Sequence, residues 1–78
     1  MLSKRLREAR MKRGYTQQNI ADRVLVSIRT YQKYEQGVRY PSYEVLIELA
    51  NELQLSIDWL LGRDDYLKSL GVSVDELP

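Results

Sequence analysis

Apolar residues recur every three or four positions along most of this chain, which is the spacing of helices that bury one face. The pattern predicts five helices, at about residues 2–13, 17–24, 28–36, 43–53 and 57–61. No segment shows the alternation of apolar and polar residues that a half-buried strand would need. The sequence therefore predicts an all-α protein.

Residues that favour helix ends stand at these boundaries. A Ser or Thr precedes each of the last four helices, at Thr16, Ser27, Ser42 and Ser56. Its hydroxyl oxygen can accept a hydrogen bond from a free backbone N–H of the first turn. Glycine follows three helices, at Gly14, Gly37 and Gly62, and suits the left-handed conformation that often ends a helix.

Two of the short helices lie within residues 16–37, where Leu25 and Val26 form a tight turn between them. The apolar positions that would face a common core are Ile20, Val24, Val26, Tyr31 and Tyr34. Polar and basic residues fill the remaining face. This layout is typical of a helix-turn-helix, whose second helix lies in the major groove of DNA.

The composition removes other classes of protein. The chain has 78 residues, 44% of them hydrophobic, which is enough for one domain with a small core. It contains no Cys and no His, so a zinc finger is excluded and the commonest general base is missing. Asp58, Asp64 and Asp65 lack the spacing of a calcium loop. We expect no metal, no cofactor and no enzymatic activity.

The net charge of +1 conceals an asymmetry between the two halves. Residues 1–40 carry ten Lys or Arg and three acids, a net charge of +7, whereas residues 41–78 carry two and eight, a net charge of −6. A basic half favours a polyanionic partner, although ordinary solvated surface charge is the alternative.

No apolar run has the length of a membrane span, and residues 1–13 are charged throughout, unlike a signal peptide. We expect a cytoplasmic protein with no membrane partner.

Several motifs in a characteristic order resemble the Cro and phage-repressor type of helix-turn-helix protein, the xenobiotic-response-element family. They are Gly14-Tyr15-Thr16-Gln17, Ile20-Ala21, Val26-Ser27, Tyr34-Glu35-Gln36-Gly37, Arg39, Pro41-Ser42 and Leu55-Ser56-Ile57-Asp58-Trp59-Leu60-Leu61-Gly62. The resemblance covers residues 2–62. It implies a compact five-helix bundle of the lambda-repressor type. It also implies a bacterial or phage-encoded transcriptional regulator, more often a repressor, that binds a palindromic operator in duplex DNA as a homodimer.

The candidate DNA-binding residues lie at the start of the second helix, along the third helix and in the loop that follows. They are Gln17, Gln18, Ser27, Ile28, Arg29, Thr30, Gln32, Lys33, Gln36, Arg39, Tyr40 and Ser42. Arginine can bind guanine bidentately, glutamine can pair with adenine, and an apolar side chain can pack on a thymine methyl group. The pattern does not decide which residues read bases and which contact phosphates, and a solvated basic face is the alternative.

The resemblance also assigns supporting roles. It implies that Gln17 contacts a phosphate and braces the third helix. It places Glu35 against Arg10 in a partly buried ion pair, so we expect neither residue to read DNA. Tyr31 and Tyr34 share the inward stripe with Ile28, which favours core packing over base stacking. Trp59 either closes the core or contributes to a dimer contact.

The chain departs from the family pattern at three positions. Leu25 stands where glycine is usual, and the cost of positive φ for leucine predicts a slightly rearranged turn. Tyr31 occupies a core position usually held by Ile or Val, so its hydroxyl must reach the rim or find a hydrogen-bond partner. Ile28 is apolar where a polar base reader is common.

Residues 63–78 lie outside the resemblance. Ser73 and Glu76 have capping-box spacing, so a short sixth helix is predicted there, and the apolar residues of this tail suit a dimerisation or packing role. The main alternative function is an antitoxin or protein-interaction module whose tail binds a partner protein. RNA is disfavoured because the A-form major groove is too narrow for a helix.

Overall fold

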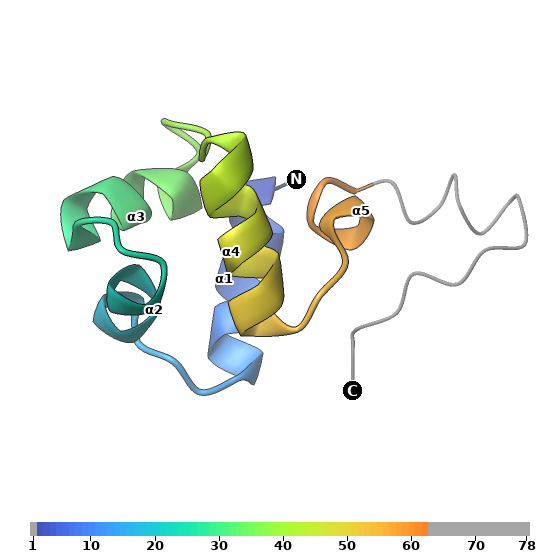
Figure 1. Ribbon diagram of the computed structural model, residues 1–78, viewed down its shortest axis with the longest axis horizontal. Helices are drawn as coiled ribbons and strands as arrows, with labels where there is room; N and C mark the ends of the chain where they lie inside the picture. Colours follow the sequence, from blue (N-terminus) through green and yellow to red (C-terminus); the bar gives the residue numbers. More distant parts are fainter. Residues whose placement is uncertain (1, 63–78) are drawn as a thin grey trace, which may run out of the picture.

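The computed structural model describes residues 2–62, and these form five helices without a strand (Figure 1). The helices are α1 (Leu2–Lys12), α2 (Gln17–Arg23), α3 (Ile28–Gln36), α4 (Tyr43–Leu53) and α5 (Ile57–Leu60). The all-α prediction is confirmed, and α1, α2 and α5 each end one residue earlier than predicted. The predicted sixth helix lies outside the described residues. No helix within residues 2–62 is long and apolar enough to cross a membrane.

Two helices far apart in the sequence, α1 and α4, lie at the centre of the bundle in Figure 1. The pair α2 and α3 lies on one side of them and α5 on the other. Helix α1 contacts both α3 and α5, and α4 contacts both α2 and α5. Helix α5 therefore contacts both central helices. Helices α2 and α3 contact each other, and each of them also contacts one central helix.

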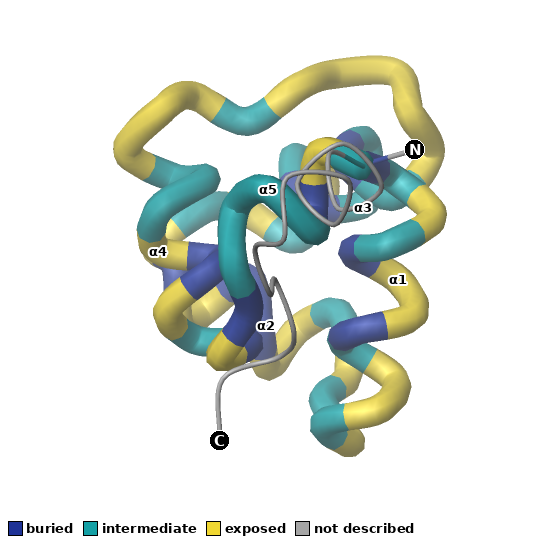
Figure 2. Tube along the Cα trace, turned by 90° about the vertical axis from the view of Figure 1, so that its right-hand side faces the viewer, coloured by how far each residue is buried: buried dark blue, intermediate teal, exposed yellow. Residues whose placement is uncertain are grey.

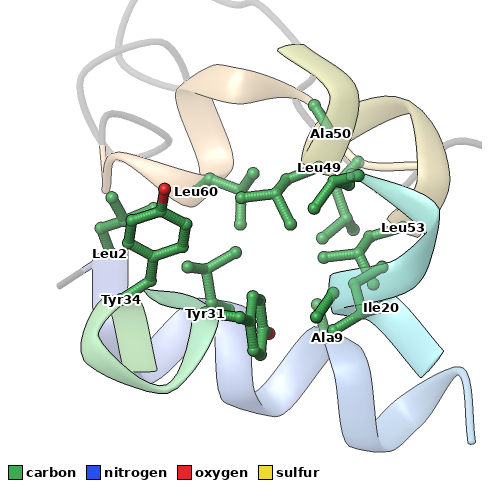
Figure 3. Close-up of a cluster of buried hydrophobic side chains, with 13 residues drawn as sticks. Leu2, Ala9, Ile20, Tyr31, Tyr34, Leu49, Ala50, Leu53 and Leu60 are labelled. Carbon is green, nitrogen blue, oxygen red and sulfur yellow. The ribbon is translucent and has the colours of Figure 1, made fainter. Parts of the chain in front are cut away.

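The core is one cluster to which all five helices contribute (Figure 3). Its largest fully buried side chains are Tyr31, Leu6, Ile20, Leu49, Leu53 and Leu60. Tyr31 and Tyr34 meet edge to face, with ring centroids 6.1 Å apart and an angle of 82° between the planes. This is the arrangement that aromatic pairs prefer. The predicted core role of both tyrosines is confirmed.

Each predicted N-cap is formed. The hydroxyl oxygens of Thr16, Ser27, Ser42 and Ser56 accept hydrogen bonds from backbone N–H groups three residues later. At α2 the cap is reciprocal: the Asn19 side chain accepts from the Thr16 N–H (3.1 Å) while the Thr16 hydroxyl accepts from the Asn19 N–H (3.0 Å). Asn19 thus performs the role that Glu or Gln takes in the usual capping box.

Left-handed residues follow all five described helices, but only three of them are glycine. They are Gly14, Leu25, Gly37, Gln54 and Gly62. At Leu25, φ is 60° and the turn is closed by two hydrogen bonds, from the Val26 N–H to the Ala21 carbonyl (3.1 Å) and from the Leu25 N–H to the Asp22 carbonyl (3.4 Å). These are the bonds of a Schellman motif. The expected rearrangement of the turn is wrong: the motif keeps its form, and Leu25 adopts the strained conformation.

Replacing Leu25 with glycine should stabilise the protein. The leucine side chain is 89% exposed, so its removal forfeits almost no packing. Removing the strain of a leucine at positive φ should raise the free energy of unfolding by about 1–2 kcal/mol. The greater conformational freedom of glycine in the unfolded chain should lower it by about 0.5–1 kcal/mol. We expect Leu25→Gly to raise the free energy of unfolding in urea by about 0.5–1 kcal/mol.

The matched control is Glu48→Gly, at an exposed position inside α4, which should lower the same free energy by about 1 kcal/mol. A destabilising effect of Leu25→Gly would show that leucine contributes something at this turn beyond its backbone conformation.

Candidate nucleic-acid interface

The two faces of α3 differ in burial and in chemistry. Tyr31 and Tyr34 point into the core (Figure 3). On the opposite side Arg29 is exposed, and Thr30 and Lys33 are partly exposed. Ile28, also partly buried, stands at the start of the helix. One helix thus carries its core anchors and the predicted DNA contacts on separate faces.

The connection between α3 and α4 continues this surface. Figure 2 shows it as an almost continuously exposed stretch, and the predicted residues Gln36, Arg39, Tyr40 and Ser42 lie in or beside it. The backbone N–H groups of Val38 and Arg39 both donate to the Lys33 carbonyl, at 3.0 and 3.3 Å. The loop therefore folds back on the end of α3, which keeps its basic residue close to that helix.

Some predicted contact residues already have partners within the protein. The Ser27 hydroxyl donates to the Thr30 hydroxyl oxygen (2.9 Å) and caps α3. The Gln18 amide donates to the Asp22 carboxylate (2.7 Å). Arg29, in contrast, has no hydrogen-bond or ion-pair partner among residues 2–62.

The carboxylate of Glu35 joins α1, α2 and α3. Arg10 donates to it from Nε (2.6 Å, to Oε2) and from Nη2 (3.2 Å, to Oε1). The Tyr31 hydroxyl donates to Oε2 (2.5 Å), and Gln17 Nε2 donates to Oε1 (3.1 Å). The Arg10 and Glu35 side chains are only 13% and 5% exposed. The predicted ion pair is confirmed, and the Tyr31 hydroxyl has found its partner.

Hydrogen bonds decide the ionisation of this cluster. Burial alone would raise the pKa of Glu35, but the hydrogen bonds from Arg10, Tyr31 and Gln17 outweigh it and hold that pKa below its ordinary value. Burial and the bond to Glu35 raise the pKa of the Tyr31 hydroxyl, which keeps it a donor. The hydrogen bond to Glu35 also raises the pKa of Arg10. The cluster is a partly buried, fully hydrogen-bonded ion pair.

Gln17 extends the cluster toward the candidate interface. Its Oε1 accepts a hydrogen bond from Gln32 Nε2 (3.2 Å), so the amide is held between Glu35 and a residue on the outer part of α3. The bracing of the third helix that the resemblance implied for Gln17 is confirmed. Its contact with a phosphate stays a prediction.

Several arginines of the basic half serve the fold. Arg5 donates to the Trp59 carbonyl (2.7 Å) and lies over its ring, and Arg13 donates to the Leu53 carbonyl (3.0 Å). Arg23 lies over the Tyr15 ring and forms an ion pair with Glu52 (3.3 Å). The contact of Arg5 also attaches Trp59 to α1, which supports the core-closing role of that tryptophan.

The sequence did not predict a polar depression of about 370 Å³ where α1 meets the helix pair α2 and α3. Its lining comprises Arg7, Arg10, Gln17, Gln32, Glu35 and Gln36. Among these residues, Arg7 is the one for which the sequence indicated no role. Its place one turn before Arg10 on the first helix was the signal that could have identified it.

Comparison with known proteins agrees with this geometry. Residues 6–60 match the profile of the helix-turn-helix family. The chain is 40% identical over 67 residues to the HTH-type transcriptional regulator ImmR of Bacillus subtilis, covering 86% of this chain and 53% of ImmR. It is 39% identical over 62 residues to the cryptic phage CTXphi transcriptional repressor RstR of Vibrio cholerae, covering 80% of this chain and 55% of RstR. The structure of the clp gene regulator ClgR from Corynebacterium glutamicum superimposes with a TM-score of 0.74 at 26% identity, covering 90% of this chain and 74% of that one.

The chain belongs to the helix-turn-helix family of DNA-binding proteins, in its Cro and phage-repressor type. This confirms the family inferred from the motifs and the five-helix fold that it implies. The family is one of regulators and not of enzymes, as the composition led us to expect. The chain spans about half the length of the curated relatives it matches.

Replacing Glu35 with glutamine should strongly destabilise the protein. The variant keeps the size of the side chain but leaves the Arg10 guanidinium without its countercharge in a site that is mostly closed to water. Breaking a buried pair in this way costs about 3–5 kcal/mol. Urea denaturation followed by circular dichroism measures it, and a variant as stable as the parent would show that the pair contributes nothing.

The stabilisation by Glu35 should disappear in acid. Its folded-state pKa lies below the ordinary value of 4.5, so the full contribution is present above that pH and is lost as the pH falls through the lower folded-state value. The stability difference between the parent and Glu35→Gln should shrink between neutral pH and about pH 3. A difference that stays constant over this range would contradict the role assigned to the carboxylate.

Proposed function

We propose that this protein is a transcriptional regulator, acting as a repressor, that binds duplex DNA sequence-specifically with α3 in the major groove. The observation that carries the proposal is the separation of faces on α3: two buried tyrosines anchor it while Arg29 is exposed and unpartnered within the described residues. An α-helix fits the major groove, where each base pair presents a distinct pattern of donors and acceptors.

The position of each side chain divides the candidates into base readers and contacts to the DNA backbone. Base readers would come from the first turns and outer face of α3, namely Ile28, Arg29, Thr30, Gln32 and Lys33. Contacts to the DNA backbone would come from the residues that flank this face, namely Gln17, Gln18, Ser27, Gln36, Arg39, Tyr40 and Ser42. Contacts of the second kind position the protein but carry no sequence information.

A homodimer would bind a palindromic operator with its two recognition helices one DNA turn apart, about 34 Å. Residues 1–62 would form the DNA-binding unit, with the helix-turn-helix at residues 16–37, and residues 63–78 would contribute the dimer contact. A regulator of this kind works where the chromosome is, which in a bacterium is the cytoplasm.

Selection of bound sites from random duplex DNA should return an inverted repeat with half-site centres about 10 base pairs apart. On that site Arg29→Ala should weaken binding by about 1–3 kcal/mol and relax the preference at one base position, because the guanidinium would be lost from a guanine edge. Gel-shift titration of the parent and the variant on the selected site and on single-base variants of it measures both effects.

The matched control is Arg29→Lys, which keeps the charge but not the bidentate fork. It should retain most of the binding to unrelated DNA and still lose the base preference. Equal weakening of Arg29→Ala on all sequences would reassign Arg29 to the backbone, and a selection without any consensus would refute sequence-specific binding.

A further inference from the structure

We propose that the depression lined by Arg7 and its neighbours is a phosphate-binding site, in which Arg7 clamps a phosphodiester group of the DNA backbone beside α3. The inference rests on the proposed function and extends it to a residue of α1. The chemistry it requires is that of a tetrahedral oxyanion, and the source to which we assign it is the DNA backbone.

The charge in the depression points to an anion. Its ionisable lining residues are Arg7, Arg10 and Glu35, so the net charge is +1. Both oxygens of the Glu35 carboxylate accept hydrogen bonds, including one each from Nε and Nη2 of Arg10. The charges of Arg10 and Glu35 therefore compensate each other, and the net positive charge belongs to Arg7.

Arg7 itself is uncommitted. Four other arginines of this half hold the fold through the contacts described above, whereas Arg7 is exposed and has no hydrogen-bond or ion-pair partner within residues 2–62. A guanidinium offers five N–H donors in a planar fork that matches the oxygens of a phosphate. Its donors are thus available to a ligand.

The glutamines supply further donors around the same depression. An amide NH₂ group has two N–H bonds. Gln17 gives one of them to Glu35, and Gln32 gives one to Gln17, so each keeps a second. The Gln36 amide is exposed and has no partner in the described part of the chain. A phosphate, which only accepts, would find a cation and the remaining N–H donors of three amide groups together.

The position favours the DNA backbone over a free anion. Gln32 and Gln36 are four residues apart on α3 and therefore share the helix face that borders the depression. A strand flanking a major groove occupied by α3 would carry its phosphates along this side. Gln17, a contact to the DNA backbone in the proposed function, lines the same depression.

The test compares Arg7→Gln with Lys12→Gln by fluorescence anisotropy, on the selected operator and on an unrelated duplex, over a series of salt concentrations. Lys12 lies on the part of α1 that borders Trp59, so its variant removes the same charge away from the depression. Arg7→Gln should weaken binding to both duplexes by the same factor and lower the salt slope by about 0.9 for each Arg7 engaged. Lys12→Gln should change the salt slope much less. Circular dichroism spectra of both variants check that each of them is folded.

Each other outcome has a definite meaning. If the parent binds the operator and Arg7→Gln binds it with the same affinity and slope, the inference is overturned while the proposed function stands. A loss confined to the operator would make Arg7 a base reader and also overturn it. Inorganic phosphate, added at constant ionic strength, should not displace the duplex; displacement would identify a free-anion site instead. If the parent binds no duplex, the proposed function itself fails.

Discussion

The carboxylate of Glu35 is the constraint on which the placement of α3 depends. It takes hydrogen bonds from one side chain of each of the first three helices, Arg10, Gln17 and Tyr31. A charge buried this deeply is tolerated only when it is paired and hydrogen-bonded, so arrangements of the three helices that separate these groups are disfavoured. The angle at which α3 leaves the core is thereby tied to this polar cluster.

The same cluster connects stability with binding. From Glu35 a chain of two amide hydrogen bonds runs through Gln17 to Gln32, on the outer part of α3. In the proposed complex with DNA, this prior ordering of the side chains would lower the entropy that binding costs. It also restricts Gln32, which keeps its carbonyl oxygen and one N–H for a ligand and not the full capacity of a free amide.

The charge asymmetry of the chain has a more limited meaning than the count of residues indicates. Arg10, Arg13 and Arg23 each make contacts within the fold, and so does Arg5. Part of the net charge of +7 therefore holds helices together, so fewer cations than that half contains are free to contact a polyanion. Composition cannot distinguish the arginines that hold the fold from those that are exposed, since all of them have the same side-chain chemistry.

Local pattern determined most of the fold. The apolar spacing and the hydroxyl caps located five helices to within a residue at most boundaries, because both depend on neighbours a few positions away. The family motifs identified the Arg10–Glu35 pair. The turn at Leu25 was misjudged, because the two hydrogen bonds that close the Schellman motif outweigh the preference of a single residue.

Only the tertiary structure decided which polar side chains remain available. The pairing of Gln17 with Gln32, the attachment of Arg5 to Trp59 and the meeting of Arg7 with α3 all join residues far apart in sequence. The sequence by itself determined that a basic helix would face outward. The packing of α1 against α3 determined which cations and amides of these two helices remain free for a ligand, because a side chain's freedom depends on partners that no local pattern specifies.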